Sequence, residues 1–231
     1  MIVRLHNLSV RNPLSADLQA VTGLMAVCDS ADSGIADPME DDVRQRWQTK
    51  GFNLQTDAWV IVTGQGQIVG YADVQRENEG ELFQFVCVHP DYRGRGIGKL
   101  LIHLMEERAR QLVQDFPLAQ RVTLSIVLSS LNERAKGVFE REGYLSARRF
   151  WRLVVEMDGD TTPTLEEFYR GGKLKLDLVI DTDNLLGAVQ TQRRSGMYTA
   201  RQYEVYQKVL RPGMAHVQVI EELCEACCTP A

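Results

Sequence analysis

The stretch HPDYRGRGIGKL, residues 89–100, places three glycines and two arginines between a segment with strand composition and a segment with helical periodicity. Glycine weakens helix starts and strand ends, so it is expected there when the backbone must adopt a positive φ or lie very close to another molecule. A tight turn needs one such glycine, whereas this junction has glycines at positions 94, 96 and 98. The sequence therefore predicts a ligand against the backbone of residues 93–98.

A strand that ends in a glycine-rich turn and leads into a helix directs several N–H groups to one point, at the positive end of the helix dipole. This arrangement is typical of a phosphate site. The dinucleotide fingerprint G-x-G-x-x-G does not fit, because Lys99 stands where the third glycine is needed. The P-loop does not fit either, because Leu100 follows Gly98 and Lys99 in place of serine or threonine.

The segments around this junction predict an α/β fold, in which the three strands before the glycines form an antiparallel meander. Strands are predicted near residues 2–10, at two segments within 57–77 joined by a turn at 64–66, and near 81–90, 121–129, 144–157 and 173–181. Helices are predicted near residues 18–28, from 37 onward, after 96, after 130, at 183–189 and at 200–210.

Two of these helices are assigned from capping patterns. Ser130 and Glu133 have the spacing of a capping box for a helix that buries Leu131, Ala135, Val138 and Phe139 and ends at Gly143. Thr199 and Gln202 have the same spacing before the last helix, along which Tyr203, Tyr206, Val209 and Leu210 form an apolar stripe.

The segment DGDTTP at 158–163 has the composition of a linker and predicts two parts. Residues 1–157 form the main domain. Residues 164–231 form a small C-terminal α/β extension that either packs on the core, covering an edge of its sheet, or mediates a homodimer contact.

The composition is that of an ordinary globular chain, with 231 residues, 44% hydrophobic residues, 25% charged residues and a net charge of -5. The mild acidity argues against nucleic acid as a partner. No apolar run is long enough to span a membrane, and the first residues lack the apolar core of a signal peptide, so we expect a cytoplasmic protein. Cys224, Cys227 and Cys228 lie near zinc-knuckle spacing without a fourth ligand, so no metal is predicted.

Arg93, Gly96 and Gly98, preceded by Val88-His89-Pro90, follow the order arginine or glutamine, two residues, glycine, one residue, glycine or alanine. This pattern resembles the acetyl-coenzyme A signature of the GCN5-related N-acetyltransferases (GNAT superfamily). The segment NERAKGVFEREGY, residues 132–144, is similar to the second motif of that family. The resemblance covers residues 1–157, with a looser likeness to the mycothiol synthase branch, and leaves residues 158–231 unmatched.

The resemblance implies a central mixed, mostly antiparallel twisted sheet flanked by helices. It also implies acetyl-CoA as the acyl donor and an amine as the acceptor. It implies that the amides of the glycine turn hold the pyrophosphate, that the adjoining strand separates from its neighbour to bind the pantetheine arm, and that an asparagine also reaches that arm. The implied cofactor-binding residues are Phe85, Val86, Cys87, Val88, Arg93, Gly94, Arg95, Gly96, Ile97, Gly98, Lys99, Asn132 and Phe139.

The reaction that the resemblance implies is the attack of a neutral amine on the thioester, and neutralising a lysine-like ammonium at pH 7 costs about 4.6 kcal/mol. Glu81 is the candidate carboxylate for water-mediated base catalysis, with a solvated strand-end charge as the alternative. Phe139 stands where many family members have an acidic tyrosine, so the usual proton donor is missing. Tyr144, Ser129, Ser130 or a tyrosine of the tail are the candidates to replace it.

Two functions are compatible with these features. One is an acetyl-CoA-dependent N-acetyltransferase that acts on a primary amine of a small molecule or peptide. The alternative is a non-catalytic acyl-CoA sensor or regulatory module, which the missing tyrosine favours. Release of a thiol from acetyl-CoA in the presence of amines distinguishes the two.

Overall fold

A computed structural model describes residues 7–33, 40–158, 168–170, 173–181 and 198–213. Its strands are β1 Leu8–Arg11, β2 Ala58–Thr63, β3 Ile68–Asn78, β4 Glu81–Val88, β5 Val122–Ser129, β6 Leu145–Asp158, β7 Phe168–Arg170, β8 Lys173–Asp181 and β9 Tyr198–Arg211. Its α-helices are α1 Leu18–Ser33, α2 Glu40–Gln48, α3 Leu54–Asp57, α4 Ile97–Leu112 and α5 Glu133–Arg141, with short 3-10 turns at Ser15–Asp17, Pro90–Tyr92 and Val113–Asp115.

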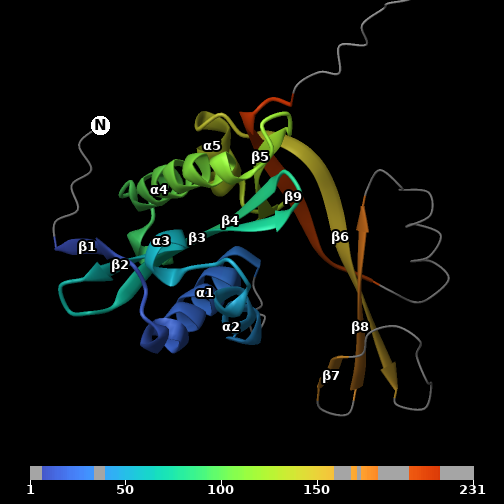
Figure 1. The fold of residues 1–231 in the computed structure, drawn as a ribbon. Coiled ribbons are helices and arrows are strands. Elements are labelled where there is room, and N and C mark those ends of the chain that lie inside the picture. Colours follow the sequence, from blue (N-terminus) through green and yellow to red (C-terminus); the bar gives the residue numbers. More distant parts are fainter. Residues whose placement is uncertain (1–6, 34–39, 159–167, 171–172, 182–197, 214–231) are drawn as a thin grey trace, which may run out of the picture.

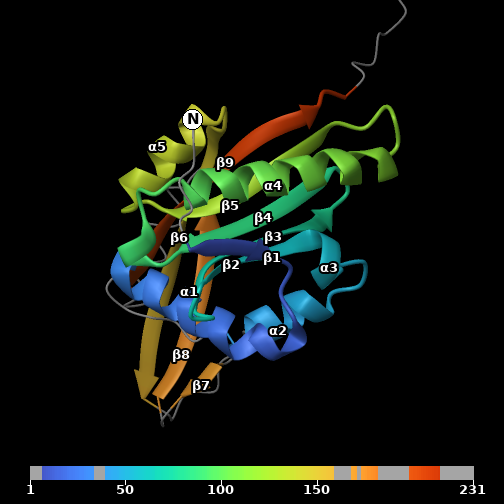
Figure 2. The same cartoon turned by 90° about the vertical axis from the view of Figure 1, so that its left-hand side faces the viewer.

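The strands form a single sheet in the order β1-β2-β3-β4-β5-β9-β6-β8-β7. Every adjacent pair with a recorded register is antiparallel except β4 and β5, which run parallel. Helices α4 and α5 lie on one side of this sheet, and α1 and α2 lie on the other (Figures 1 and 2). The predicted α/β fold with a mixed, mostly antiparallel sheet is confirmed.

The core has two apolar layers, one on each face of the sheet. The stripe of α4, which includes Ile97, Leu101 and Met105, packs with residues of β3, β4 and β5. Val21 and Leu24 of α1 pack with β2 and β3 on the opposite face. These are the faces that the helical spacing predicts, since apolar residues three and four positions apart share one side of a helix.

The parallel strands β4 and β5 pair over only three residues, from Glu81 opposite Thr123 to Phe83 opposite Ser125. β4 continues to Val88, where it still pairs with β3, and β5 continues to Ser129, where it still pairs with β9. The two strands therefore diverge after Phe83, and beyond that point the edge of β4 that faces β5 pairs with no strand among the described residues.

The helix predicted at 200–210 is wrong, because these residues belong to strand β9. This strand lies between β5 and β6, and Glu204, Val205 and Tyr206 are consecutively buried. Because three consecutive residues of β9 are buried, its apolar residues do not simply alternate with polar ones, and their spacing imitates that of a helix. Tyrosine and valine favour strands, and pairing on both sides outweighs the capping pattern at Thr199.

The capping box at Ser130 and Glu133 is also wrong. Helix α5 begins after Asn132, whose side-chain oxygen accepts a hydrogen bond from the N–H of Ala135 at 3.0 Å. Leu131 precedes the helix and is 77% exposed, so it is not part of the buried face. Asparagine is as good an N-cap as serine, and the shift of two residues moves Leu131 out of the helix.

The strands before and after the expected linker at 158–163 belong to the same sheet. β8 pairs with β6, and β7 pairs with β8 at the far edge, whereas β9 lies inside the sheet. The division of the chain into two domains stays a prediction. Residues 2–6 of the first predicted strand, the helix at 183–189 and the cysteines at 224–228 lie outside the described residues.

Candidate functional site

The glycine turn forms the N-terminus of α4. Gly94 and Gly96 have φ values of 79° and 85°, in the left-handed region that favours glycine. Gly96 is the N-cap residue of α4, and no side chain caps this end of the helix. The first N–H groups of a helix lack intrahelical partners, so those that follow Gly96 are available to an anion at the positive end of the dipole.

The side chains of the two arginines in this turn are already engaged. Arg93 donates from Nε to the carbonyl of Val88 at 3.0 Å, and its two Nη atoms donate to Asp32 at 2.6 and 3.2 Å. Arg95 donates to the carbonyl of Asp91 at 2.9 Å and lies over the ring of Tyr92. The groups of the turn that remain available to a ligand are therefore its backbone N–H groups. The side chain of Arg93 instead links the end of β4 to α1.

Asp32, near the end of α1, connects the two sides of the strand divergence. Besides Arg93, which follows β4, its Oδ2 accepts a hydrogen bond at 2.9 Å from Nδ2 of Asn132, which follows β5. Nearby, Asp29 of the same helix accepts two hydrogen bonds from Arg201 of β9, at 2.9 and 3.1 Å. The sequence analysis missed Asp32 because nothing in its local pattern indicates partners 61 and 100 residues away.

The side chains of the unpaired part of β4 alternate between the two faces. Phe85 and Cys87 pack with the layer of α1 and α2, and Val86 and Val88 pack with the layer of α4. Because the side chains point to the faces, the N–H and C=O groups of this segment lie in the plane of the sheet, and those not bonded to β3 face the gap beside β5. Cys87 is 8% exposed.

Lys99 and Ile97, the other predicted residues of the turn, use their side chains elsewhere. The ammonium of Lys99 lies 2.7 Å from the carboxylate of Glu142. This contact and that of His103 hold the pKa of Glu142 below its ordinary value, against a smaller opposing effect of burial. Ile97 is buried in the α4 layer and Gly98 lies within the first turn of the helix, so only their backbone groups face the turn.

Glu81 lies at the start of β4, in the paired part next to the divergence. Its Oε1 accepts hydrogen bonds from the hydroxyl of Ser125 at 2.7 Å and from the amide of Gln207 at 3.3 Å. By strand alternation these side chains share the face of the sheet opposite α4. Glu81 is thus a fixed carboxylate rather than a freely solvated strand-end charge.

Phe139 and Tyr144 lie in the core. Phe139 is 2% exposed, and its ring meets the ring of Tyr144 edge to face with 5.0 Å between centroids. Tyr144 is completely buried, and its hydroxyl has no hydrogen-bond partner among the described residues. Burial first, and then the charge of Glu106, raise the pKa of Tyr144. A buried hydroxyl of this kind is a poor proton donor to a thiolate, and we do not assign it that role.

A buried polar cluster on the α2 side of the sheet was also missed. Asp73 is completely buried and accepts hydrogen bonds from Tyr71 at 2.6 Å and from Arg46 at 3.1 Å, and Trp47 donates to Tyr71 at 2.8 Å. Burial raises the pKa of Asp73, although Arg46 opposes that effect. The guanidinium of Arg46 also lies 5.6 Å from the ring centre of Phe85, so the cluster fastens α2 to β3 and β4.

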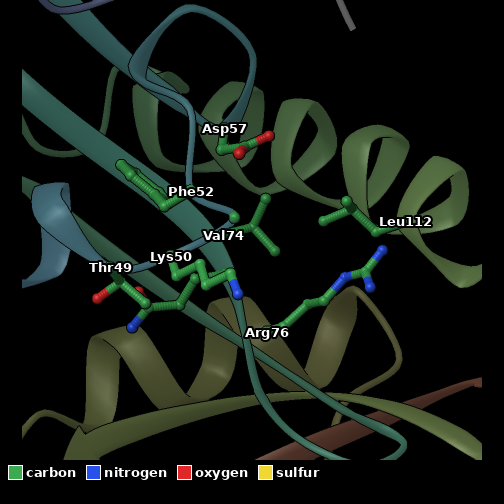
Figure 3. A pocket seen from close by; sticks show the side chains of 9 residues that line it. Thr49, Lys50, Phe52, Asp57, Val74, Arg76 and Leu112 are labelled. Atoms are coloured by element: carbon green, nitrogen blue, oxygen red, sulfur yellow. The ribbon is translucent and has the colours of Figure 1, made fainter. Parts of the chain in front are cut away.

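A pocket lies away from the glycine turn, where the segment after α2 meets β3 and the end of α4 (Figure 3). It is lined by Thr49, Lys50, Gly51, Phe52, Asp57, Val74, Gln75, Arg76 and Leu112. On β3, Arg76 pairs with Leu82 near the start of β4, whereas Gly70 pairs with Val88 at its end. The pocket is therefore at the opposite end of β4 from the turn.

No described helix is long and apolar enough to cross a membrane.

Comparison with known proteins finds similarity over part of the chain. Residues 55–145 match the acetyltransferase (GNAT) domain family. A mycothiol acetyltransferase of Saccharopolyspora erythraea is 30% identical over 107 residues, which cover 45% of this chain and 35% of that protein. The chain thus matches about a third of the length of this curated relative.

Solved structures share the fold at low sequence identity. A GCN5-related N-acetyltransferase from Sphaerobacter thermophilus superposes with a TM-score of 0.77 at 19% identity, over 90% of this chain and 97% of the other. A phosphinothricin acetyltransferase from Sinorhizobium meliloti in complex with AcCoA gives a TM-score of 0.52 at 16% identity, over 90% and 91%. The match of residues 55–145 to the acetyltransferase (GNAT) domain family and the shared fold both agree with the glycine turn and the divergent parallel strands.

Proposed function

We propose that this protein is an acetyl-CoA-dependent N-acetyltransferase that acts on a primary amine of a small molecule or peptide. The observation that carries the proposal is the divergence of β4 and β5 beside the glycine turn. It leaves an unpaired strand edge and an uncapped helix N-terminus next to one another. Such an edge can pair with an extended amide chain, and such a helix end binds phosphate.

In this proposal the pyrophosphate of coenzyme A binds the amides of residues 93–98. The pantetheine arm adds to the free edge of β4 at residues 85–88, as an extra strand would. Asn132 contributes the N–H that it does not donate to Asp32. The S. meliloti relative with AcCoA supports the choice of cofactor.

The amine then attacks the carbonyl carbon of the thioester, and the sulfur leaves as a thiolate. Glu81, on the face of the sheet away from α4, is the proposed base. No tyrosine acid is required, because a thiol with a pKa of about 8.5 leaves unprotonated at pH 7 at a penalty of about 2 kcal/mol. This matters here because Phe139 has no proton to donate and Tyr144 is buried.

The proposal is tested by calorimetry with coenzyme A and by thiol release from acetyl-CoA in the presence of a panel of primary amines. We expect binding and amine-dependent release. Binding without release by any amine would favour the alternative of an acyl-CoA sensor, and absence of binding would reject both functions.

A further inference from the structure

Arg46 of α2 lies over the face of β4 that also carries Glu81. Side chains alternate along the strand, so those of residues 81, 83 and 85 share the face opposite α4. The guanidinium of Arg46 lies 5.9 Å from the ring centre of Phe83 and 5.6 Å from that of Phe85. Both rings are half-buried. A positive charge therefore lies on the face of the proposed base, over the rings that follow it along the strand.

A buried carboxylate fixes the position of this guanidinium. Asp73 is completely buried, and its Oδ1 accepts a hydrogen bond from Nη1 of Arg46 at 3.1 Å. Its Oδ2 accepts a hydrogen bond from the hydroxyl of Tyr71 at 2.6 Å, and Trp47 donates to that hydroxyl at 2.8 Å. Both oxygens of the carboxylate are thus engaged. Asp73 and the two rings together hold the guanidinium in one place.

These contacts leave part of the guanidinium available to a ligand. Its Nη1 donates to Asp73, whereas Nε and Nη2 donate to no acceptor among the described residues. The side chain of Arg46 keeps 22% exposure. An ion pair that serves only to neutralise Asp73 needs one charged donor, which a lysine would also supply. The planar fork of arginine instead matches the oxygens of a carboxylate or phosphate.

We propose that Arg46 determines the specificity of the acceptor site by binding a carboxylate or phosphate group of the acceptor amine. The inference rests on the proposed function and names its substrate class, a primary amine that carries an oxyanion. Glu81 and Phe83 are two residues apart on β4, which is about 7 Å along an extended strand. Several bonds must therefore separate the amine of the acceptor from its anion.

An acceptor of this class meets an opposite charge at each end, the amine end at Glu81 and the anion at Arg46. A plain alkyl amine leaves the guanidinium without an acceptor, so it should be a poorer substrate. A diamine brings a second cation toward the guanidinium, so it should be the poorest of the three. The three kinds of amine therefore separate this proposal from a site that reads only the amine.

The binding test uses the full chain with nitrogen-15 in its arginine side chains, and the Nε–H signal of Arg46 is assigned by its loss in Arg46→Lys. The probes share a six-carbon chain. 6-Aminohexanoate and 6-aminohexyl phosphate carry an anion, and hexylamine carries none. We expect the two anionic probes to shift the Arg46 signal and hexylamine to leave it unchanged. The tighter of the two anionic probes identifies the oxyanion.

Arg46→Lys should weaken the binding of the anionic probes about tenfold in calorimetry, as expected for the loss of a charge-assisted hydrogen bond. Lysine keeps a positive charge beside Asp73, so the fold should be retained. Arg76→Lys is the matched control, because Arg76 also pairs with an aspartate, Asp115, and lies over a phenylalanine ring, that of Phe116. That variant should bind the anionic probes as the wild type does.

Steady-state kinetics gives a second readout, the ratio of kcat/KM for 6-aminohexanoate to kcat/KM for hexylamine. The wild type should favour 6-aminohexanoate, with 1,6-diaminohexane the poorest acceptor, and Arg46→Lys should lose most of this preference. A merely structural role of Arg46 would change kcat/KM for all three amines alike.

Equal affinities of the wild type for 6-aminohexanoate and hexylamine, or an undiminished preference in Arg46→Lys, would overturn the inference. The NMR arm needs no turnover. A protein that binds the anionic probes as expected but acetylates nothing would therefore reject the proposed function and keep the inference. A protein that acetylates 6-aminohexanoate and hexylamine with equal kcat/KM would keep the proposed function and reject the inference.

Discussion

Asp32 and Arg93 form a two-pronged ion pair between the end of α1 and the glycine turn, and Asp32 also holds Asn132 across the gap between β4 and β5. Both partners of the ion pair are about three-quarters buried, at 22% and 23% exposure. The carboxylate thus fixes the distance between the two turns that flank the proposed cofactor path.

We expect Asp32→Ala to lower the free energy of unfolding by about 1–3 kcal/mol, because it leaves a partly buried guanidinium without its partner. It should also weaken coenzyme A binding, measured by calorimetry. Asp17→Ala is the matched control, since it breaks the two-pronged pair with Arg11 far from the turn. That variant should lose stability but keep its affinity. Equal affinities in both variants would show that Asp32 has only a structural role.

Gly96→Val should abolish coenzyme A binding, because a side chain at this N-cap would block the approach of the pyrophosphate. The same change imposes strain of about 1–3 kcal/mol at a positive φ. Gly66→Val controls for that strain, since Gly66 has the same φ of 85° in the turn between β2 and β3. Calorimetry should find binding in Gly66→Val and none in Gly96→Val. Binding by a folded Gly96→Val protein would place the phosphates elsewhere.

Phe139→Tyr should destabilise the protein by about 1–3 kcal/mol without raising turnover, because the added hydroxyl enters a core with no described partner for it. Conversely, Tyr144→Phe removes a buried hydroxyl that has no hydrogen-bond partner among the described residues, and it should leave stability unchanged or raise it. Thermal unfolding and amine-dependent thiol release measure the two effects. A faster reaction of Phe139→Tyr at neutral pH would show instead that the missing acid limits the enzyme.

Lys136 of α5 and Glu204 of β9 form a buried ion pair at 2.7 Å, with side-chain exposures of 10% and 7%. Lys136→Met or Glu204→Leu alone should cost up to about 3–5 kcal/mol, since the buried charge left behind keeps only a more exposed partner, Arg149 beside Glu204 or Glu133 beside Lys136. The double variant should cost less than the sum of the two. Urea unfolding measures this cycle. Additive losses would mean that the pair is not coupled.

The same pair predicts a pH dependence of stability. Burial acts to raise the pKa of Glu204, but Lys136, together with smaller effects of Arg149 and Ser146, holds that pKa below its ordinary value. The stabilisation is therefore present above the ordinary glutamate range and is lost as the pH falls through the lowered pKa. We expect the free energy of unfolding to fall more steeply on acidification in the wild type than in the double variant. Parallel curves would contradict this assignment.

The sequence predicted those parts of the fold that local patterns encode. Helix α4, with its apolar stripe, and the glycines of its first turn have local signals, because helical periodicity and a positive φ are properties of neighbouring residues. Strand β9 was mistaken for a helix because its environment comes from β5 and β6, which are distant in sequence. Glu81 was predicted as a candidate base, but Ser125 and Gln207 beside it carry no local signal.

The most direct measurement of the central claim is amide hydrogen exchange of the full chain with and without coenzyme A. If the cofactor lies across the divergence of β4 and β5, protection should increase at residues 85–88 and 94–99, and residues 64–67 of the β2–β3 turn should exchange at unchanged rates. Saturating coenzyme A that protects neither of the first two segments, or protects residues 49–52 of the separate pocket instead, would contradict the account.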